Sequence, residues 1–185
     1  MTDPQEGTLD CFFETVVIRD LGKMINQAEL HYLSFGIMGP VIELLGSVYD
    51  YKTFHTTDRI WRKRFNRALK KIPSLQRYKQ YIKSSHDLYS NMRSGMVHVG
   101  LPGKHVVFTQ RSDPNEGGRH LDKDSYSGEQ RLILVCEDLY EDIVKAVEYV
   151  RSDSSTKKGL NTLFMNPRLV PDSGLVPTST PAASG

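Results

Sequence analysis

The sequence predicts a mainly α-helical fold, an up-and-down helical bundle with a β-hairpin inserted before the last helix. In five segments, apolar residues recur at steps of three and four, which is the period of an amphipathic helix. Two short runs, HVVFT and RLILV, are instead rich in β-branched residues, which favour strands.

The first two helices are expected on either side of a turn near Gly36. The apolar period predicts the first helix over 9–33 and the second over 37–48. Gly39 and Gly46 fall inside the second helix, where glycine is unfavourable unless another backbone approaches closely. These two positions therefore indicate a close contact with another helix.

Two further helices follow a stretch without helical period. The third is expected to begin at the capping residues of 56–58 and to end at Pro73, with Phe65 on its apolar side. The fourth is expected over 74–98 as the longest uninterrupted helix, ended by Gly100 and the breakers after it.

The strand runs at 105–109 and 131–135 predict a hairpin over about 105–135. The polar residues between the two runs predict a flexible loop of about twenty residues. The segment 136–152 regains the helical period and predicts the last helix.

The composition predicts one domain. The chain has 185 residues, of which 38% are apolar, enough for a single core over 9–151. A flexible N-terminus is expected over 1–8. A disordered tail is expected over 152–185, where Ser, Pro, Thr and Gly become frequent.

Several functional classes are disfavoured by composition. No run of eighteen apolar residues is present, and the N-terminus carries acidic residues, so we expect a soluble cytoplasmic protein that does not cross a membrane. Cys11 and Cys136 stand apart from any Cys or His cluster, which predicts free thiols. The histidines are irregularly spaced, so we expect no metal and no cofactor.

Positive charge is concentrated in one segment. The stretch from Arg59 to His86 contains ten Lys and Arg residues and no Asp or Glu, although the net charge is only +2. Such a run is either a solvated helix face or a surface for a polyanion such as RNA. The residues expected to contact nucleic acid are Arg62, Lys63, Arg67, Lys70 and Lys71.

The stretch SNMRSGMVHVGLPGK places Arg93 and His98 near the end of the fourth predicted helix. Arginine binds phosphate oxygens through a fixed fork of donors, and histidine exchanges protons near neutral pH. The pair meets the minimum for metal-free RNA cleavage, with His98 removing the 2′-hydroxyl proton and Arg93 stabilising phosphoryl charge. The alternative is structural, with Arg93 pairing to a neighbouring helix and His98 capping carbonyls.

Residues five apart in an α-helix differ by about 140° in direction. Arg93 and His98 therefore act together only if the last turn loosens, or if a two-fold partner approaching at Gly95 completes the site. Glu29 or Glu43 is expected to orient the arginine.

Two residues near this pair are expected to have auxiliary roles. Ser94 follows the arginine and offers a hydroxyl donor to a phosphate. His86, seven residues before Arg93, lies almost on the same helical stripe and is either a phosphate contact or a helix histidine without a functional role.

The segment LYSNMRSGMVHVGLPGK, preceded by IMGPVIELLGS and followed by the predicted hairpin and last helix, resembles the HEPN superfamily. It is similar to uncharacterised bacterial HEPN-like proteins with an R-N-G-L-V-H-type motif, over about Leu9 to Arg151. The resemblance implies a helical bundle that forms a homodimer, in which the R-x4-6-H motifs of both subunits meet in a cleft. In catalytic members this cleft is a metal-independent endoribonuclease site. Arg93 and His98 match the motif, and Ser94 takes the polar position after the arginine.

We therefore expect an RNA-directed HEPN-like protein, a metal-independent endoribonuclease of defence or toxin type, with RNA as substrate and an antitoxin or other protein as partner. The alternative is a non-catalytic HEPN-like module that binds nucleic acid or a nucleotide, or that mediates assembly. A third possibility is an adaptor whose tail recruits a partner.

Overall fold

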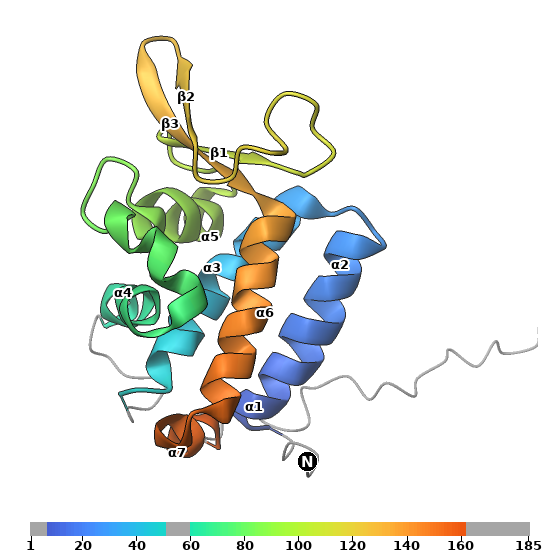
Figure 1. The fold of residues 1–185 in the computed structure, drawn as a ribbon, viewed down its shortest axis with the longest axis vertical. Helices are drawn as coiled ribbons and strands as arrows, with labels where there is room; N and C mark the ends of the chain where they lie inside the picture. The colour runs from blue at the N-terminus through green and yellow to red at the C-terminus, as the bar shows by residue number, and fades with distance from the viewer. Residues whose placement is uncertain (1–6, 51–59, 162–185) are drawn as a thin grey trace, which may run out of the picture.

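A computed structural model describes residues 7–50 and 60–161 of the chain. The structure is mainly helical, and a small three-stranded sheet covers one end of the helices (Figure 1). The predicted capping residues at 56–58 lie outside the described residues, as do most of the predicted flexible N-terminus and residues 162–185 of the predicted tail.

The first helical segment is continuous but changes its winding. It consists of α1 (Leu9–Phe12), the π-helical η1 (Phe13–Leu21) and α2 (Gly22–Asn26). It ends earlier than predicted because Glu29 takes a left-handed conformation, with φ of 53°. The apolar residues that extended the predicted helix to residue 33 belong instead to the next helix.

Helix α3 (His31–Ser47) runs through the centre of the molecule. Gly36 lies inside it, so the predicted turn at Gly36 is wrong. The predicted close contacts are confirmed, since a Cβ on Gly39 would stand 3.0 Å from the Arg93 Cα atom. A Cβ on Gly46 would overlap the backbone of Arg64 in helix α4 (Trp61–Lys71).

The fourth predicted helix is broken in two. A 3-10 segment, η2 (Pro73–Tyr81), is followed by turns, and a second helix then begins as the π-helical η3 (Tyr89–Ser94) and continues as α5 (Gly95–Val99). The physical reason is Asp87, whose carboxylate accepts hydrogen bonds from the N–H groups of Lys83 at 3.0 Å and Ser90 at 2.9 Å. A side-chain cap of this kind starts a new helix.

The strands pair differently from the predicted hairpin. The sheet order is β1-β3-β2, and β1 (Val106–Thr109) lies parallel to β3 (Glu129–Val135). The hairpin joins β3 to β2 (Lys123–Tyr126), which lies in the stretch predicted as a loop. Its two-residue turn uses positive φ at Ser127 and Gly128, as hairpin turns require.

The last predicted helix is confirmed as α6 (Cys136–Ser152), which packs between α3 and the first helical segment (Figure 1). The chain then continues into η4 (Ser154–Thr156) and α7 (Lys157–Leu160), so the folded part extends beyond the predicted boundary at 151. Leu160 is buried against the core because the short helix turns it back toward the bundle.

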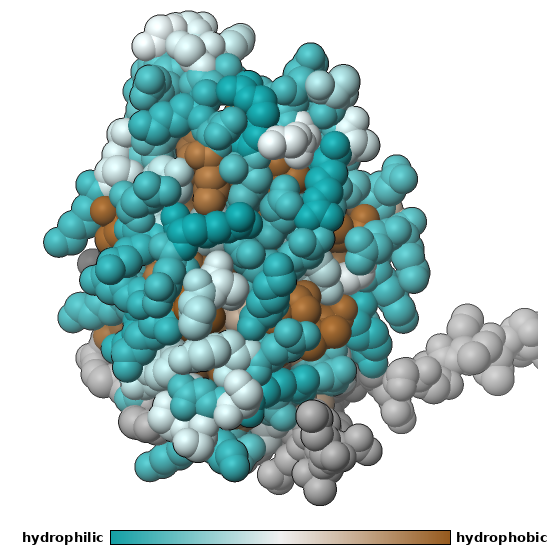
Figure 2. All heavy atoms as spheres, viewed as in Figure 1, coloured by the Kyte–Doolittle hydropathy of each residue, from teal (hydrophilic) through white to brown (hydrophobic). Residues whose placement is uncertain are grey.

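The core lies where these helices and the inner strand β3 meet. Fully buried side chains include Phe13, Phe35, Ile42, Leu69, Leu134 and Ile143. The face shown in Figure 2 is mainly hydrophilic, with small separate hydrophobic areas. Among the described residues, no helix combines the length and the apolar character needed to cross a membrane.

A buried polar network holds the β1–β2 connection onto the bundle. His120 Nδ1 accepts the Val135 N–H at 2.9 Å, so its Nε2 carries the proton and donates to the Tyr78 hydroxyl at 2.9 Å. Tyr78 donates in turn to Asp142 at 2.8 Å, which also pairs with Arg77 at 2.6 Å. Burial, reinforced by the Arg77 charge, lowers the pKa of His120 from 6.5 to about 4.

Candidate functional site

Arg93 is placed by the crossing of η3 over α3. The backbone of Arg93 rests on Gly39, where any larger residue would crowd the arginine. The side chain is 16% exposed, so it lies at the edge of the core. The sequence folds this way because Gly39 allows two helix backbones to approach closely.

The predicted contact of Glu43 with Arg93 is confirmed, and it also agrees with the structural alternative in which Arg93 pairs with a neighbouring helix. Arg93 Nε donates to Glu43 Oε2 at 2.9 Å, and the glutamate side chain is 7% exposed. Burial raises the pKa of Glu43, and the charge of Arg93 opposes that effect. Glu29 lies elsewhere, beside His31 and Glu137, and the structure gives it no contact with the arginine.

Tyr89 connects Arg93 to the basic helix. The Arg93 guanidinium lies 5.6 Å from the centre of the Tyr89 ring, and the Arg62 guanidinium lies 4.6 Å from the same ring. Both distances suit cation–π contacts. The aromatic ring therefore brings two arginines from different helices together.

His98 stands on the final turn of α5 and is exposed. Gly100, at φ of 70°, ends the helix and donates its N–H to the Met96 carbonyl at 3.2 Å. Within 7–50 and 60–161, His98 makes no hydrogen bond to those carbonyls, and none joins it to Arg93. The structure therefore brings the two motif residues onto one helix but not into contact within one chain.

Exposed apolar side chains surround the end of α5. Tyr32 at the start of α3 donates its hydroxyl to the Gly100 carbonyl at 2.7 Å, which joins the two helix ends. Val99 is 70% exposed, and Leu101 is 61% exposed. We use the name apolar patch for the exposed apolar residues at these two joined helix ends: Leu30, Tyr32, Leu33, Val97, Val99 and Leu101.

Gly95 does not provide the predicted opening for a partner backbone. A Cβ there would stand 2.5 Å from the Leu101 carbonyl oxygen and 3.3 Å from the Gly103 nitrogen. The chain's own loop after α5 occupies that space. Ser94, beside the arginine, is half-buried.

His86 does not fit the predicted phosphate contact. It is 7% exposed, and its Nε2 donates to the Gln130 carbonyl at 3.1 Å. Its Nδ1 therefore accepts from the Ser85 hydroxyl at 3.1 Å. The residue ties the turn before η3 to strand β3. It lies in a turn, so its expected position on a helix is wrong as well.

Among the described residues, carboxylates outside the basic run partly neutralise it, including Asp142, which pairs with Arg77 at 2.6 Å. Asp87 pairs with Arg62 at 3.0 Å. Asp50 pairs with Arg64 at 2.7 Å and Arg67 at 3.0 Å, and Arg64 is buried. The sequence could not show this, because these aspartates are distant from the arginines along the chain.

A basic groove remains on α4, with a volume of about 340 Å³. Lys71 lies over the Tyr49 ring at 4.8 Å. The groove is lined by Lys63, Asn66, Arg67, Lys70 and Lys71. Four of the five residues expected to contact nucleic acid therefore share one surface, and the fifth, Arg62, lies beside Tyr89.

In the described part of the chain, no three His, Cys, Asp or Glu side chains are grouped to hold a metal ion. Comparisons with protein-family models, with curated proteins and with solved structures found no match for this chain.

Proposed function

We propose that this chain is a HEPN-like protein that acts on RNA as a metal-independent endoribonuclease, with a site completed by two subunits. The observation that carries the proposal is the placement of Arg93. It is held through Nε by Glu43, while its outer guanidinium nitrogens have no hydrogen bond among the described residues. An arginine fixed on one side and open on the other suits a phosphate contact.

The chemistry follows from the two side chains. His98 removes the proton from a ribose 2′-hydroxyl, whose oxygen attacks the adjacent phosphorus and forms a 2′,3′-cyclic phosphate. The 5′-oxygen of the next nucleotide leaves and takes a proton. Arg93 stabilises the charge on the phosphoryl oxygens, which is greatest in the transition state. DNA lacks the attacking hydroxyl, so the reaction is restricted to RNA.

The basic groove supports RNA as the substrate. The groove on α4 supplies positive charge, and Arg62 and Arg93, each paired with one carboxylate, contact the same Tyr89 ring. Lysines and arginines along one surface bind the phosphate backbone of a single strand.

The apolar patch supports the homodimer. Val99 and Leu101 expose apolar surface next to His98, and exposed apolar surface of this kind is typical of interaction sites. A two-fold contact through the apolar patch would bring His98 of one subunit toward the site of the other. An antitoxin that covers the apolar patch would compete with the same contact.

The second candidate is a non-catalytic module that binds nucleic acid or a nucleotide. It is favoured by one observation, the absence of any contact between His98 and Arg93 within one chain. In that case Arg93 and the basic groove would bind phosphate, and His98 would have no chemical role.

The experiment is cleavage of a fluorescent single-stranded RNA in EDTA by wild type, His98→Ala and His105→Ala. His105 is a matched control, since it lies outside the motif sequence and its half-buried ring packs near His86. We expect 2′,3′-cyclic phosphate ends from wild type and His105→Ala, and a loss of about 10²- to 10⁴-fold in His98→Ala. RNA binding without cleavage by folded wild type would instead support the binding module.

A further inference from the structure

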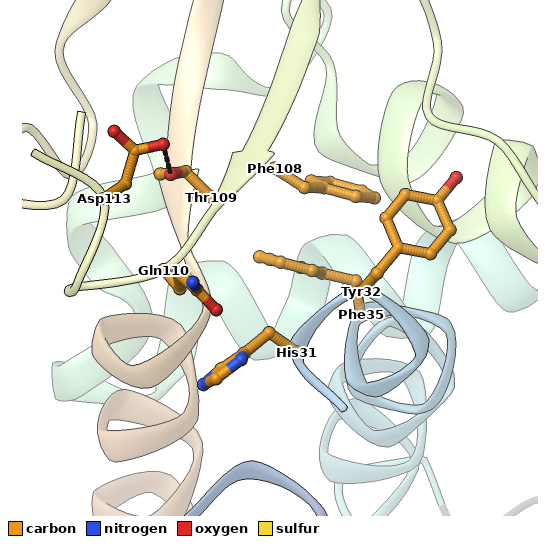
Figure 3. A pocket seen from close by; sticks show the side chains of 7 residues that line it. All are labelled: His31, Tyr32, Phe35, Phe108, Thr109, Gln110 and Asp113. Atoms are coloured by element: carbon orange, nitrogen blue, oxygen red, sulfur yellow. Dashed lines mark hydrogen bonds between the residues drawn. The ribbon is translucent and has the colours of Figure 1, made fainter. Parts of the chain in front are cut away.

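Two adjoining cavities lie at the start of α3, where Tyr32 meets the end of α5. One has a volume of about 240 Å³ and the other about 280 Å³. His31 and Gln110 line both cavities, so the two spaces lie on either side of these side chains. Figure 3 shows the first cavity, with the Gln110 amide beside the His31 ring.

The first cavity has an aromatic wall. Phe35 and Phe108 stack with ring centres 3.9 Å apart and an interplanar angle of 7°, and Tyr32 meets Phe108 edge-on at 6.1 Å. These rings come from α3 and from the end of β1 (Figure 3). A dry cavity of about 150 Å³ is enough to hold a benzene ring. The aromatic cavity therefore has room for a small ring with a short side chain.

The charges around both cavities are negative. Asp113 lines the first, aromatic cavity, and Glu29 and Glu137 line the second cavity. Neither cavity has a Lys or Arg among its lining residues. The guanidinium of the nearby Arg111 is taken by Asp138 at 2.7 Å and by Glu141 at 2.6 Å.

Two of these carboxylates, Asp113 and Glu137, are held in place by backbone N–H groups. The N–H groups of Asn115 and Glu116 hold the pKa of Asp113 below its ordinary value. The Arg111 N–H donates to Glu137 Oε2 at 3.0 Å. The cavities therefore favour a cation, because carboxylates without a neighbouring Lys or Arg attract positive charge.

His31 has a buried nitrogen without a partner. Its Nε2 faces Glu137 Oε1 at 3.3 Å, whereas its Nδ1 is buried and has no hydrogen bond in the described residues. In the tautomer that carries its proton on Nε2, beside the carboxylate, Nδ1 is an acceptor that lacks a donor. Leaving a buried polar atom without a partner is unfavourable, so a ligand that supplies the donor gains affinity from that contact.

We propose that these cavities form a binding site for a small organic amine, with an aromatic or apolar body against Tyr32, Phe35 and Phe108 and an ammonium group between His31 and the carboxylates. The ammonium donates a hydrogen bond to His31 Nδ1 once the Gln110 side chain turns aside. The proposal goes beyond RNA cleavage, and it shares Tyr32 with the apolar patch.

The test uses three compounds of similar shape and different charge: tyramine, the neutral 4-ethylphenol and the anionic 4-hydroxyphenylacetate. Binding to the full chain is measured by ligand-observed NMR titration and by the shift in Tm. We expect saturable tyramine binding at least 10-fold tighter than either analogue. Absence of saturable tyramine binding at millimolar concentration, or equal binding of the anion, would overturn the proposal.

A pair of variants locates the site. Glu137→Gln removes one carboxylate charge and keeps the side-chain shape, so tyramine affinity should fall at least 5-fold. Glu148→Gln changes an exposed glutamate on the same helix and should leave the affinity unchanged. Unchanged affinity in a folded Glu137→Gln would contradict the placement. If that variant does not fold, the comparison of the three compounds on wild type still decides the proposal.

Discussion

Mild acidification is expected to destabilise the fold through His120. In the folded chain this imidazole is neutral, because Nδ1 accepts the Val135 N–H and Nε2 donates to Tyr78. Protonation would place a second N–H against the Val135 N–H and a positive charge near Arg77. The unfolded chain has no such restriction and binds the proton at the ordinary pKa.

The magnitude follows from the pKa of His120, which burial and the nearby Arg77 lower from 6.5 to about 4. One pKa unit corresponds to about 1.4 kcal/mol, so the complete loss is about 3 kcal/mol. Because the folded pKa is depressed, this stability is present above pH 6.5 and is lost as the pH falls toward 4. At pH 5 the loss is about 2 kcal/mol.

The assay is urea unfolding of wild type and His120→Gln at pH 7 and pH 5. We expect the free energy of unfolding of wild type to fall by about 2 kcal/mol between these pH values. His120→Gln should be less stable at pH 7 and should lose much less on acidification. An equal loss in both proteins would show that His120 is not the group responsible.

Three further predictions concern the candidate site. Gly36→Ala should raise Tm, because a Cβ there would stand 3.7 Å from its nearest neighbour and alanine favours a helix over glycine by about 1 kcal/mol. Gly39→Ala should instead lower Tm and the cleavage rate, because its Cβ would displace Arg93. Equal effects of the two substitutions would contradict the close helix crossing at Gly39. Val99→Asp should leave Tm within a few degrees of wild type but shift light scattering from dimer to monomer, and an unchanged dimer would place the interface elsewhere. The triple variant Lys63→Gln, Lys70→Gln and Lys71→Gln neutralises most of the basic groove. It should reduce the slope of log K against log salt for single-stranded RNA by about 2, because three fewer phosphate contacts are made. An unchanged slope would exclude the groove as the binding surface.

The helical class and the last helix could be predicted from the sequence because they depend on local apolar period. Gly39 and Gly46 also indicated close helix crossings correctly, since glycine inside an apolar helix usually has a packing reason. The break within the fourth predicted helix was missed. The signal was present in Asp87, whose side chain caps a new helix, although apolar residues continue at helical spacing across the break.

The sheet could not be predicted because strand pairing is a long-range property. β2 consists of polar residues that resemble a loop, and its hairpin partner is β3 instead of β1. The partners of the basic run were missed for the same reason, since Asp50 and Asp87 meet Arg64 and Arg62 only in the folded chain. Apolar period also could not identify the His31 cavities, because the tertiary fold assembles them.

The most direct test of the central claim is subunit mixing of Arg93→Ala and His98→Ala. Each variant alone should be inactive on RNA in EDTA. If one subunit supplies Arg93 and its partner supplies His98, random exchange should restore about a quarter of wild-type activity, because half of the dimers are mixed and each of these keeps one intact site. Inactive mixtures in which exchange is confirmed by mass spectrometry would contradict a site shared between two subunits.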